Sequence, residues 1–331
     1  MTLVRVTARC RVDFAGGTLD IWPLGLLHPG SSTVNVAIEL PVVVELEPRT
    51  SGWTIVQGDE RTECADAAGL AADPHTALVG LVAEQGGLGG GVVRIASGSP
   101  RGAGLGASSA LTVALLAAVE VATAGRLVES PAARAAIARD LEARLMSLPT
   151  GRQDHFPAQL GGALALEHRA GGERIRPLAV DLAALGARWL VAYTGQSHFS
   201  AGNNWQVVRA RLDGDAAIVA RLDRVRDVAR GVVTALEAGD WPRLGALLAE
   251  EWQARRGLAE GISTPRIEEL LAAAARLGAW GGKACGAGGG GCLVTLAPPE
   301  RRPEIEAAWR AAGARILAAP PTAAGLEVVI P

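Results

Sequence analysis

The chain has 331 residues, of which 49% are hydrophobic and 20% are charged, and its formal net charge is -2. This composition is typical of a globular protein with a full hydrophobic core, and the length favours one large domain or two smaller ones. The charge balance gives no indication of the basic face that nucleic-acid-binding proteins present. We therefore expect no nucleic-acid partner.

The cysteines and the apolar segments bear on the cellular environment. Cys10, Cys64, Cys285 and Cys292 lack the C-x-x-C spacing of a zinc site or a redox motif. We expect reduced, buried thiols in a cytoplasmic protein. The first residues alternate like a strand and lack the apolar run of a signal peptide. The most apolar later stretch, ALTVALLAAVEVATAG, is short for a spanning helix and carries Glu120, so we expect no membrane partner.

The first half of the chain is predicted to mix strands and helices. Period-2 alternation and short apolar runs predict strands over residues 3–14, 34–47 (with Pro41 at a bend or bulge), 52–58 and 92–96. Helical patterns cover residues 74–85, 107–123 and 130–146. The last of these helices has Ser130 as a predicted N-cap and Pro131 at its first position.

The second half continues in the same way. Strands are predicted over residues 163–168, 188–195, 291–298 and 325–331. Helices are predicted over residues 204–237 (as one or two helices), 241–260, 264–277 and 303–312. Helices and strands mixed along the whole chain predict an α+β fold with two lobes.

A glycine-rich loop between the strand at 92–96 and the helix at 107–123 predicts a phosphate site. It reads SGSPRGAGLGASSAL from Ser97. Glycines let backbone N–H groups point at an anion, and the helix start adds partial positive charge. The loop lacks the lysine of a P-loop. It meets the dinucleotide fingerprint only with Ala107 at the third position and no good strand beyond it. We interpret it as a third kind of phosphate cradle, with a plain Gly-rich turn capped by Ser as the alternative.

Four segments, in order along the chain, resemble the motifs of the GHMP kinases, the superfamily of galactokinase, homoserine kinase, mevalonate kinase and phosphomevalonate kinase. ARCRVDFAGGTLD (8–20) resembles the family's first motif, PRGAGLGASSAL (100–111) its second and GGKACGAGGGGCLVTL (281–296) its third. A fourth segment, TGRQDHFPAQLGG (150–162), resembles the stretch that holds the family's catalytic aspartate. Together they extend over nearly the whole chain. RVDFAGGTLD and YTGQSHFSAGNNW are most similar to the D-glycero-D-manno-heptose 7-phosphate kinase branch.

The resemblance implies a fold and an activity. The fold would have the active site in a cleft between an N-terminal, ATP-binding domain (1–165) and a C-terminal domain (166–331). The activity would be ATP-dependent transfer of the γ-phosphate to a hydroxyl of a sugar or sugar phosphate, with a heptose 7-phosphate-like acceptor favoured. ATP and Mg²⁺ would be the cofactors, a small molecule the partner, and a monomer or homodimer the assembly. Two positions depart from the family: Ala107 replaces its usual Ser, and His155 replaces the Gln common in heptose kinases.

The resemblance also implies which residues bind the nucleotide and the metal. ATP would contact the second motif and two positions of the third, namely Pro100, Arg101, Gly102, Ala103, Gly104, Leu105, Gly106, Ala107, Ser108, Ser109, Lys283 and Gly288. Lys283 would contact phosphate or only hold the third motif beside the second. Ser108 and Glu142 would hold the metal. The alternative for Glu142 is a solvated helix charge paired with Arg139 or Arg144.

Catalysis and acceptor binding are assigned to the first and fourth segments. Asp154 would accept or orient the proton of the acceptor hydroxyl, with an Asx-turn as the alternative role. Arg11 would favour the charged form of Asp154 and stabilise the transferring charge. The acceptor would contact Gly16, Gly17, Thr18, Asp20, His155 and His198.

Three alternatives stay open on the sequence. One is another reaction on the same fold, a mevalonate-type or amino-acid-type kinase or a decarboxylase. The second is a non-catalytic sensor of nucleotide and sugar, which has no need of Asp154, Glu142 and Ser108 together. The third is a dinucleotide-dependent enzyme.

Overall fold

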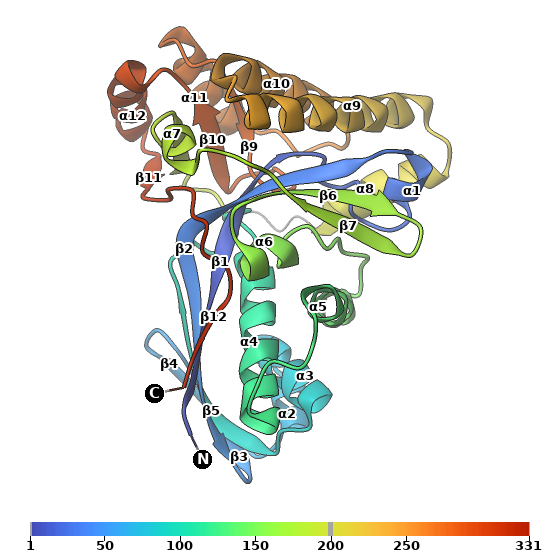
Figure 1. Cartoon of the computed structure of the whole chain (residues 1–331), viewed down its shortest axis with the longest axis vertical. Helices are drawn as coiled ribbons and strands as arrows, with labels where there is room; N and C mark the ends of the chain where they lie inside the picture. Colours follow the sequence, from blue (N-terminus) through green and yellow to red (C-terminus); the bar gives the residue numbers. More distant parts are fainter. Residues whose placement is uncertain (1, 198–200, 331) are drawn as a thin grey trace.

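The computed structural model describes residues 2–197 and 201–330, which form two lobes. Figure 1 shows a tall lobe built on long strands and a second lobe of helices at its upper end. The mixed α+β architecture predicted from the sequence is confirmed.

The tall lobe is built on a sheet of eight strands within the described residues. Its main path is β12-β1-β2-β5-β3-β4, and the β6–β7 hairpin extends from β2. The strands are β1 (Val4–Ala15), β2 (Ser32–Arg49), β3 (Gly52–Gln57), β4 (Glu60–Cys64), β5 (Gly90–Ser97), β6 (Ala163–Arg169), β7 (Gly172–Pro177) and β12 (Glu327–Val329). The β3–β5 pair is parallel, and the other pairs of this sheet are antiparallel.

One long helix, α4, lies along a face of this sheet (Figure 1). The helices that precede β6 along the chain are α1 (Leu24–Leu27), α2 (Ala67–Ala72), α3 (Ala77–Gly86), α4 (Ala107–Ala124), α5 (Pro131–Met146) and α6 (His155–Leu160). By length and composition α4 could cross a membrane, but most of it is buried inside the lobe. Its apolar character is explained by its place between the sheet and the neighbouring helices, because a helix that is apolar all round is a buried one.

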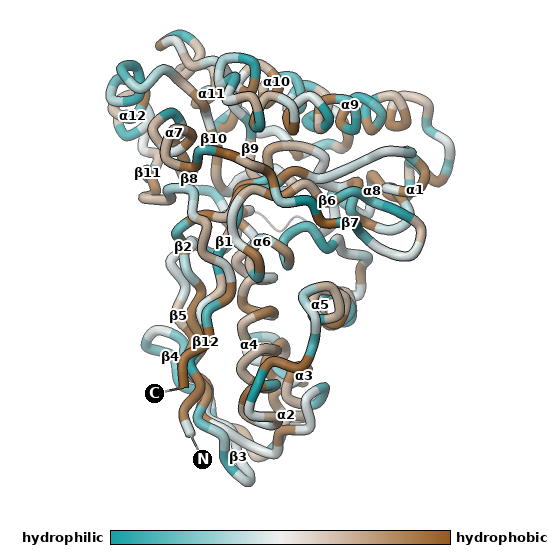
Figure 2. Tube along the Cα trace, viewed as in Figure 1, coloured by the Kyte–Doolittle hydropathy of each residue, from teal (hydrophilic) through white to brown (hydrophobic). Residues whose placement is uncertain are grey.

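The second lobe has its own smaller sheet, with order β11-β8-β10-β9 in the described part of the chain. Its strands are β8 (Trp189–Tyr193), β9 (Gly281–Ala284), β10 (Cys292–Leu296) and β11 (Arg315–Leu317). The helices are α7 (Leu182–Gly186), α8 (Ala201–Leu212), α9 (Ala216–Ala238), α10 (Trp241–Arg255), α11 (Pro265–Arg276) and α12 (Arg302–Ala311), with a 3₁₀ turn, η1 (Pro299–Arg301). Figure 2 shows hydrophilic and hydrophobic residues alternating along α9, as expected for a helix with one buried face.

Most long elements match the sequence prediction, and the differences have physical reasons. Pro41 marks an irregularity, since the β1–β2 register shifts between the pairs Arg9–Pro41 and Cys10–Ile38. The elements that the sequence analysis missed (β4, β7, β9, β11, α1, α2, α6, α7 and η1) are all short. The proposed domain boundary after residue 165 falls inside β6, and β7 and β12 join the first sheet. The division at that point stays a prediction.

Candidate active site

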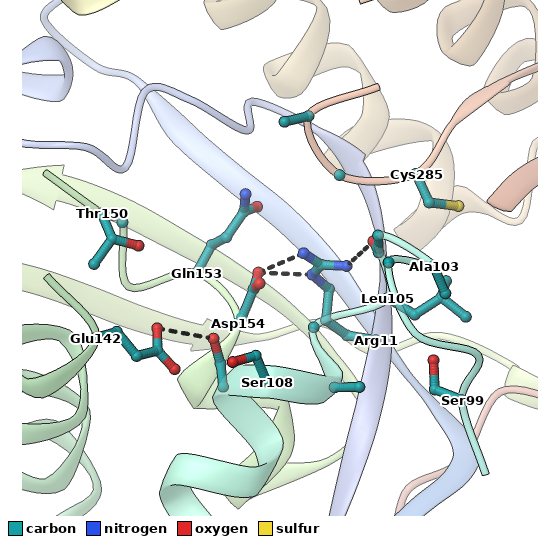
Figure 3. Close-up of a pocket in the computed structure, with 18 of the residues that line it drawn as sticks. Arg11, Ser99, Ala103, Leu105, Ser108, Glu142, Thr150, Gln153, Asp154 and Cys285 are labelled. Carbon is teal, nitrogen blue, oxygen red and sulfur yellow. Dashed lines mark hydrogen bonds and ion pairs between the residues drawn. The ribbon is translucent and has the colours of Figure 1, made fainter. Parts of the chain in front are cut away.

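A cavity of about 470 Å³ lies between the two lobes. Figure 3 shows part of its lining, with Arg11 and Asp154 at the centre and Glu142 and Cys285 on opposite sides. The lining includes residues 99–109, most of 149–154, and residues 285–288. The cavity therefore brings together residues from all four sequence motifs.

The glycine loop before α4 is shaped to receive an anion. Gly102, Gly104 and Gly106 have φ values of 65°, 72° and 72°, which favour glycine over any other residue. Gly106 is the N-cap of α4, and no side chain in the described part of the chain caps this helix. Since residues 107–109 line the cavity, the first N–H groups of α4 are left for an anion bound there.

The glycine loop of the second motif (residues 102–106) and the glycine loop of the third motif (residues 285–291, named here the third glycine loop) touch through their backbones. A Cβ on Gly104 would lie 2.5 Å from the carbonyl oxygen of Cys285. A Cβ on Gly286 would lie 3.0 Å from the carbonyl oxygen of Gly104. The Cys292 N–H also donates to the Ala103 carbonyl at 2.8 Å. Glycine is thus required on both sides of this contact.

Asp154 and Arg11 form an ion pair at the centre of the cavity (Figure 3). Asp154 Oδ1 accepts from Arg11 Nε at 2.8 Å and lies 2.6 Å from Nη2, while Nη1 donates to the Gly104 carbonyl at 2.7 Å. Burial would lower the pKa of Arg11, but the carboxylates of Asp154 and Asp13 raise it overall, so the guanidinium stays charged. Asp154 precedes α6 without capping it. The Asx-turn alternative is therefore wrong, because the carboxylate faces Arg11.

Glu142 is held by hydroxyl groups of α4 and by a buried histidine. Oε1 accepts from Thr112 Oγ1 at 2.8 Å, and Oε2 accepts from Ser109 Oγ at 3.2 Å. His155 Nε2 lies 3.2 Å from Oε2. Burial would raise the pKa of Glu142, but His155 and these hydrogen bonds lower it overall. Glu142 is thus a buried, ionised carboxylate on the wall of the cavity.

The alternative role of Glu142 as a solvated partner of a neighbouring arginine is wrong. Arg139 lies 2.5 Å from Asp140, and Arg144 lies 3.6 Å from Glu84. Ser108, the other predicted metal ligand, also lines the cavity. No group of three or more His, Cys, Asp or Glu residues in the described chain would hold a metal by itself. This sparse donor set fits Mg²⁺, which takes few protein ligands when phosphate oxygens supply the others.

Three predicted contacts are corrected by their positions. His155 is fully buried, and its ring faces Glu142 rather than the cavity, so it is no acceptor ligand. Lys283 is also fully buried, with Nζ 2.9 Å from Asp13, so its predicted contact with ATP is wrong. Gly16 does not line the cavity, and a Cβ there would lie 1.9 Å from the Ser32 carbonyl oxygen.

The other predicted acceptor residues divide into three groups. Thr18 and Asp20 line the cavity. Gly17 does not, and it is held from behind, where its carbonyl accepts from Arg255 Nη2 at 3.0 Å. His198 lies outside the described residues.

Asp20 has one oxygen that is bound and one that is not. Oδ2 accepts from the Gln153 N–H at 3.1 Å, whereas Oδ1 is buried without a partner among the described residues. Burial, reinforced by the charge of Asp154, raises the pKa of Asp20 to about 6. A buried acceptor of this kind calls for a donor, such as a hydroxyl of a bound ligand.

Sequence reasoning missed four cavity or near-cavity residues that the fold brings together. Arg255 and Gln153 line the cavity, and Asp13 and Glu251 are buried close behind it. Asp13 stood within the first motif, which was a usable signal. Glu251 and Arg255 have the i, i+4 spacing of an ordinary helix pair, so nothing local indicated their place.

Cys285 also lines the cavity but is no nucleophile, because burial raises the pKa of its thiol to about 12. All four cysteines are free; Cys64 is half-buried and the other three are buried. The predicted burial is thus confirmed for Cys10, Cys285 and Cys292 and is wrong for Cys64.

Comparisons with known proteins agree with this geometry. Two family models match, "GHMP kinases N terminal domain" over residues 75–162 and "GHMP kinases C terminal" over residues 232–315, together more than half of the chain. A galactokinase from Mycobacterium tuberculosis is 30% identical over 247 residues, covering 65% of this chain and 67% of that protein. A mevalonate kinase from Pyrococcus abyssi is 31% identical over 232 residues, covering 67% of this chain and 63% of that protein.

A solved structure extends the comparison to the whole fold. The structure of a D-glycero-D-manno-heptose 1-phosphate kinase from Bacteriodes thetaiotaomicron superposes with a TM-score of 0.78 at 19% identity, covering 98% of both chains. At that identity the likeness shows the fold. With the family models and the relatives, it shows that this chain belongs to the GHMP kinases, a family of ATP-dependent phosphotransferases.

Proposed function

We propose that this protein is a Mg²⁺- and ATP-dependent kinase that phosphorylates a hydroxyl of a sugar or a sugar phosphate. The observation that carries the proposal is that three features share one cavity. They are the start of α4, which no side chain caps in the described chain, the Arg11–Asp154 ion pair, and the Asp20 carboxylate, whose Oδ1 has no partner among the described residues. Phosphoryl transfer needs a site for the phosphates, a group that can act as a base, and groups that hold the substrate hydroxyl by hydrogen bonds, and this cavity contains a candidate for each. A cytoplasmic location and a monomeric or dimeric assembly stay predictions.

The donor side would bind the triphosphate through backbone groups. Residues 102–109 would supply N–H groups and the helix dipole, and Gly288, which also lines the cavity, would supply further backbone. Glu142 and Ser108 would hold Mg²⁺ beside the phosphates. The ion would neutralise charge on the phosphate oxygens as it develops. His155 would act behind Glu142 by keeping its carboxylate charged and oriented.

The acceptor side would place a hydroxyl against Asp154. The carboxylate of Asp154 would accept or orient the hydroxyl proton. Arg11, which contacts both Asp154 and the Gly104 carbonyl, would hold the base beside the phosphate cradle. Thr18 and Asp20 would bind further hydroxyls.

Asp20 supports a sugar-type acceptor over a mevalonate-type one. Its buried, partnerless Oδ1 can accept a hydrogen bond from a hydroxyl. The carboxylate of mevalonate placed beside it would repel it. Galactokinase and heptose kinase names occur among the similar proteins beside mevalonate kinase names, so Asp20 rather than these names carries the choice of acceptor class.

An acceptor panel in a coupled ADP-release assay tests the proposal. The panel contains hexoses, heptoses, their phosphates, mevalonate and homoserine, each with MgATP. We expect turnover with a member of the first three groups. If these all fail while mevalonate or homoserine is phosphorylated, the acceptor class is wrong. Binding of NAD(P) in place of ATP would contradict the activity itself.

Asp154→Asn tests the mechanism on the acceptor so identified. We expect kcat to fall about 10³-fold, because the candidate base is lost, while binding of a non-hydrolysable ATP analogue is largely kept. Asp140→Asn is the matched control, since that carboxylate lies on the exposed side of α5 with 66% of its side chain exposed. Equal turnover in the Asp154→Asn variant and the wild type would remove Asp154 from the mechanism.

A further inference from the structure

Four charged side chains form a continuous line of contacts beneath the cavity. They come from β1, β9 and α10, and none is more than 3% exposed: Asp13, Lys283, Glu251 and Arg255. We name them the buried charge chain. Their charges alternate in sign along the line, and the two carboxylates and two cations give a net charge of zero.

One end of the buried charge chain holds the third glycine loop. Asp13 Oδ1 accepts from the Gly286 N–H at 2.6 Å. Gly286 in turn packs against the backbone of Gly104 in the phosphate cradle. A shift of Asp13 would therefore move the contact between the two loops that line the nucleotide side of the cavity.

The other end holds the loop of residues 16–20, which we name the acceptor loop. Arg255 Nη1 donates to Thr18 Oγ1 at 3.2 Å, and Nη2 donates to the Gly17 carbonyl at 3.0 Å. Thr18 has a φ of 74°, a left-handed conformation that a β-branched residue rarely adopts. Such a conformation persists only where the surroundings impose it, and Arg255 donates to it directly.

The middle of the buried charge chain joins the two ends. Lys283 Nζ lies 2.9 Å from Asp13 Oδ2 and 3.1 Å from Glu251 Oε2. Glu251 Oε1 accepts from Arg255 Nε at 2.8 Å and from Nη2 at 2.5 Å. Because each of these side chains is at most 3% exposed, removing one charge leaves its neighbour uncompensated and shifts the next pair.

We propose that the buried charge chain is a positioning device that fixes the acceptor loop relative to the third glycine loop. Loss of Arg255 at the acceptor end would then weaken nucleotide binding at the far end, although Arg255 touches neither glycine loop in any hydrogen bond of the described chain. The proposal rests on the proposed function in one respect, that residues 102–109 and 286–291 bind the nucleotide.

Calorimetric titration with AMP-PNP and Mg²⁺ tests this inference without knowledge of the acceptor. We expect Arg255→Met to weaken AMP-PNP binding about 5-fold, and Arg255→Lys, which keeps the cation, to weaken it less. The matched control is Arg134→Met. Arg134 is as buried as Arg255 and pairs with Glu120 at 2.8 Å on α4, away from both loops. Arg134→Met should lower the melting temperature and leave the affinity for AMP-PNP unchanged.

A double variant gives the second readout. Asp13→Asn combined with Arg255→Met should weaken AMP-PNP binding less than the product of the two single effects, because either change alone already interrupts the buried charge chain. The inference is overturned if Arg255→Met and Arg134→Met both lower the melting temperature while neither changes the affinity. It is also overturned if the two single effects multiply. If Arg255→Met does not fold, Arg255→Lys carries the same comparison. Failure of the wild type to bind AMP-PNP would instead contradict the proposed function.

Discussion

Asp20 is the residue whose charge changes within the pH range of an ordinary assay. Burial, with the charge of Asp154, raises its pKa from 3.8 to about 6. Its charged form can accept hydrogen bonds through both oxygens, so we expect the KM of the acceptor to fall as the pH rises through about 6. The measurement is KM between about pH 5 and pH 8. Asp20→Asn should raise KM and remove this inflection; an identical inflection in the variant would assign it to another group.

The same pKa shift makes the free energy of unfolding depend on the charge of Asp20, in a direction that follows from the raised pKa. Since the folded pKa exceeds the unfolded value of 3.8, the folded state holds its proton longer as the pH rises. The stability that this group contributes is present below 3.8 and is lost as the pH rises through about 6. Asp20→Asn should therefore flatten the fall in unfolding free energy between these pH values, measured by urea unfolding.

His155 is expected to act on the metal through Glu142. Its ring nitrogen lies 3.2 Å from the Glu142 carboxylate and cannot reach the cavity. His155→Ala should raise the Mg²⁺ concentration for half-maximal activity about 10-fold, the usual effect of removing a partner of a metal ligand. His155→Gln keeps a donor and should raise it less. An unchanged Mg²⁺ dependence in both variants would mean that Glu142 does not hold the ion.

At the scale of single residues, the sequence could predict what the motifs contain. Arg11, Asp154 and Asp20 lie at the cavity as the motifs implied. The spacing of residues does not show which of them are buried. Lys283 and His155 were therefore predicted to contact ATP and the acceptor, although in the fold they face the carboxylates of Asp13 and Glu142. Arg255 was out of reach, because only the packing of α10 behind β1 brings it to the acceptor loop.

At the scale of elements, the contact between the two glycine loops has a sharp test. Gly104→Ala and Gly125→Ala place the same side chain at nearly the same φ, 72° and 73°. The left-handed φ alone should lower the unfolding free energy by about 1 kcal/mol at each position. Only at Gly104 does the new Cβ meet a neighbour, the Cys285 carbonyl oxygen, while nothing lies within 4 Å at Gly125. AMP-PNP binding should weaken in Gly104→Ala alone. Equal affinities would show that the loops can separate without cost to the nucleotide.

Long elements were predictable because each one carries its own pattern. The Ser130 hydroxyl accepts from the Ala133 N–H, as the predicted N-cap of α5 should. Short elements depend on their partners instead. β9 and β11 have four and three residues, and each is a strand only because β10 or β8 pairs with it. Such pairing is a long-range property that a local window does not contain.

At the scale of the whole molecule, the C-terminal strand lies beside the N-terminal strand. β12 pairs with β1, so the last strand closes the first sheet beside the N-terminal strand (Figure 1). Before it, the segment 319–326 bonds to both β2 and α6. The Thr322 N–H donates to the Ala37 carbonyl, and the Leu326 N–H donates to the Gln159 carbonyl, both at 2.9 Å. Sequence position alone therefore does not separate the two lobes.

This closure predicts that the C-terminal segment supports the catalytic loop. Gln159 belongs to α6, which begins directly after Asp154, so loss of the Leu326 contact should loosen the base. Truncation after Ala319 removes backbone hydrogen bonds to Ala37, Glu39, Gln159 and Gly162. The truncation also removes β12 and its pairing with β1. At about 1 kcal/mol for each of the four hydrogen bonds, the free energy of unfolding should fall by more than about 4 kcal/mol, measured by urea unfolding.

Truncation after Val329 is the control for this effect, because it keeps the whole of β12 and removes only the residues beyond it. It should leave both stability and kcat unchanged. The longer truncation should lower kcat more than it weakens AMP-PNP binding, since the segment contacts α6 and β2 rather than the glycine loops. Equal losses of kcat and nucleotide affinity would show that the segment stabilises the fold as a whole and does not act through Asp154.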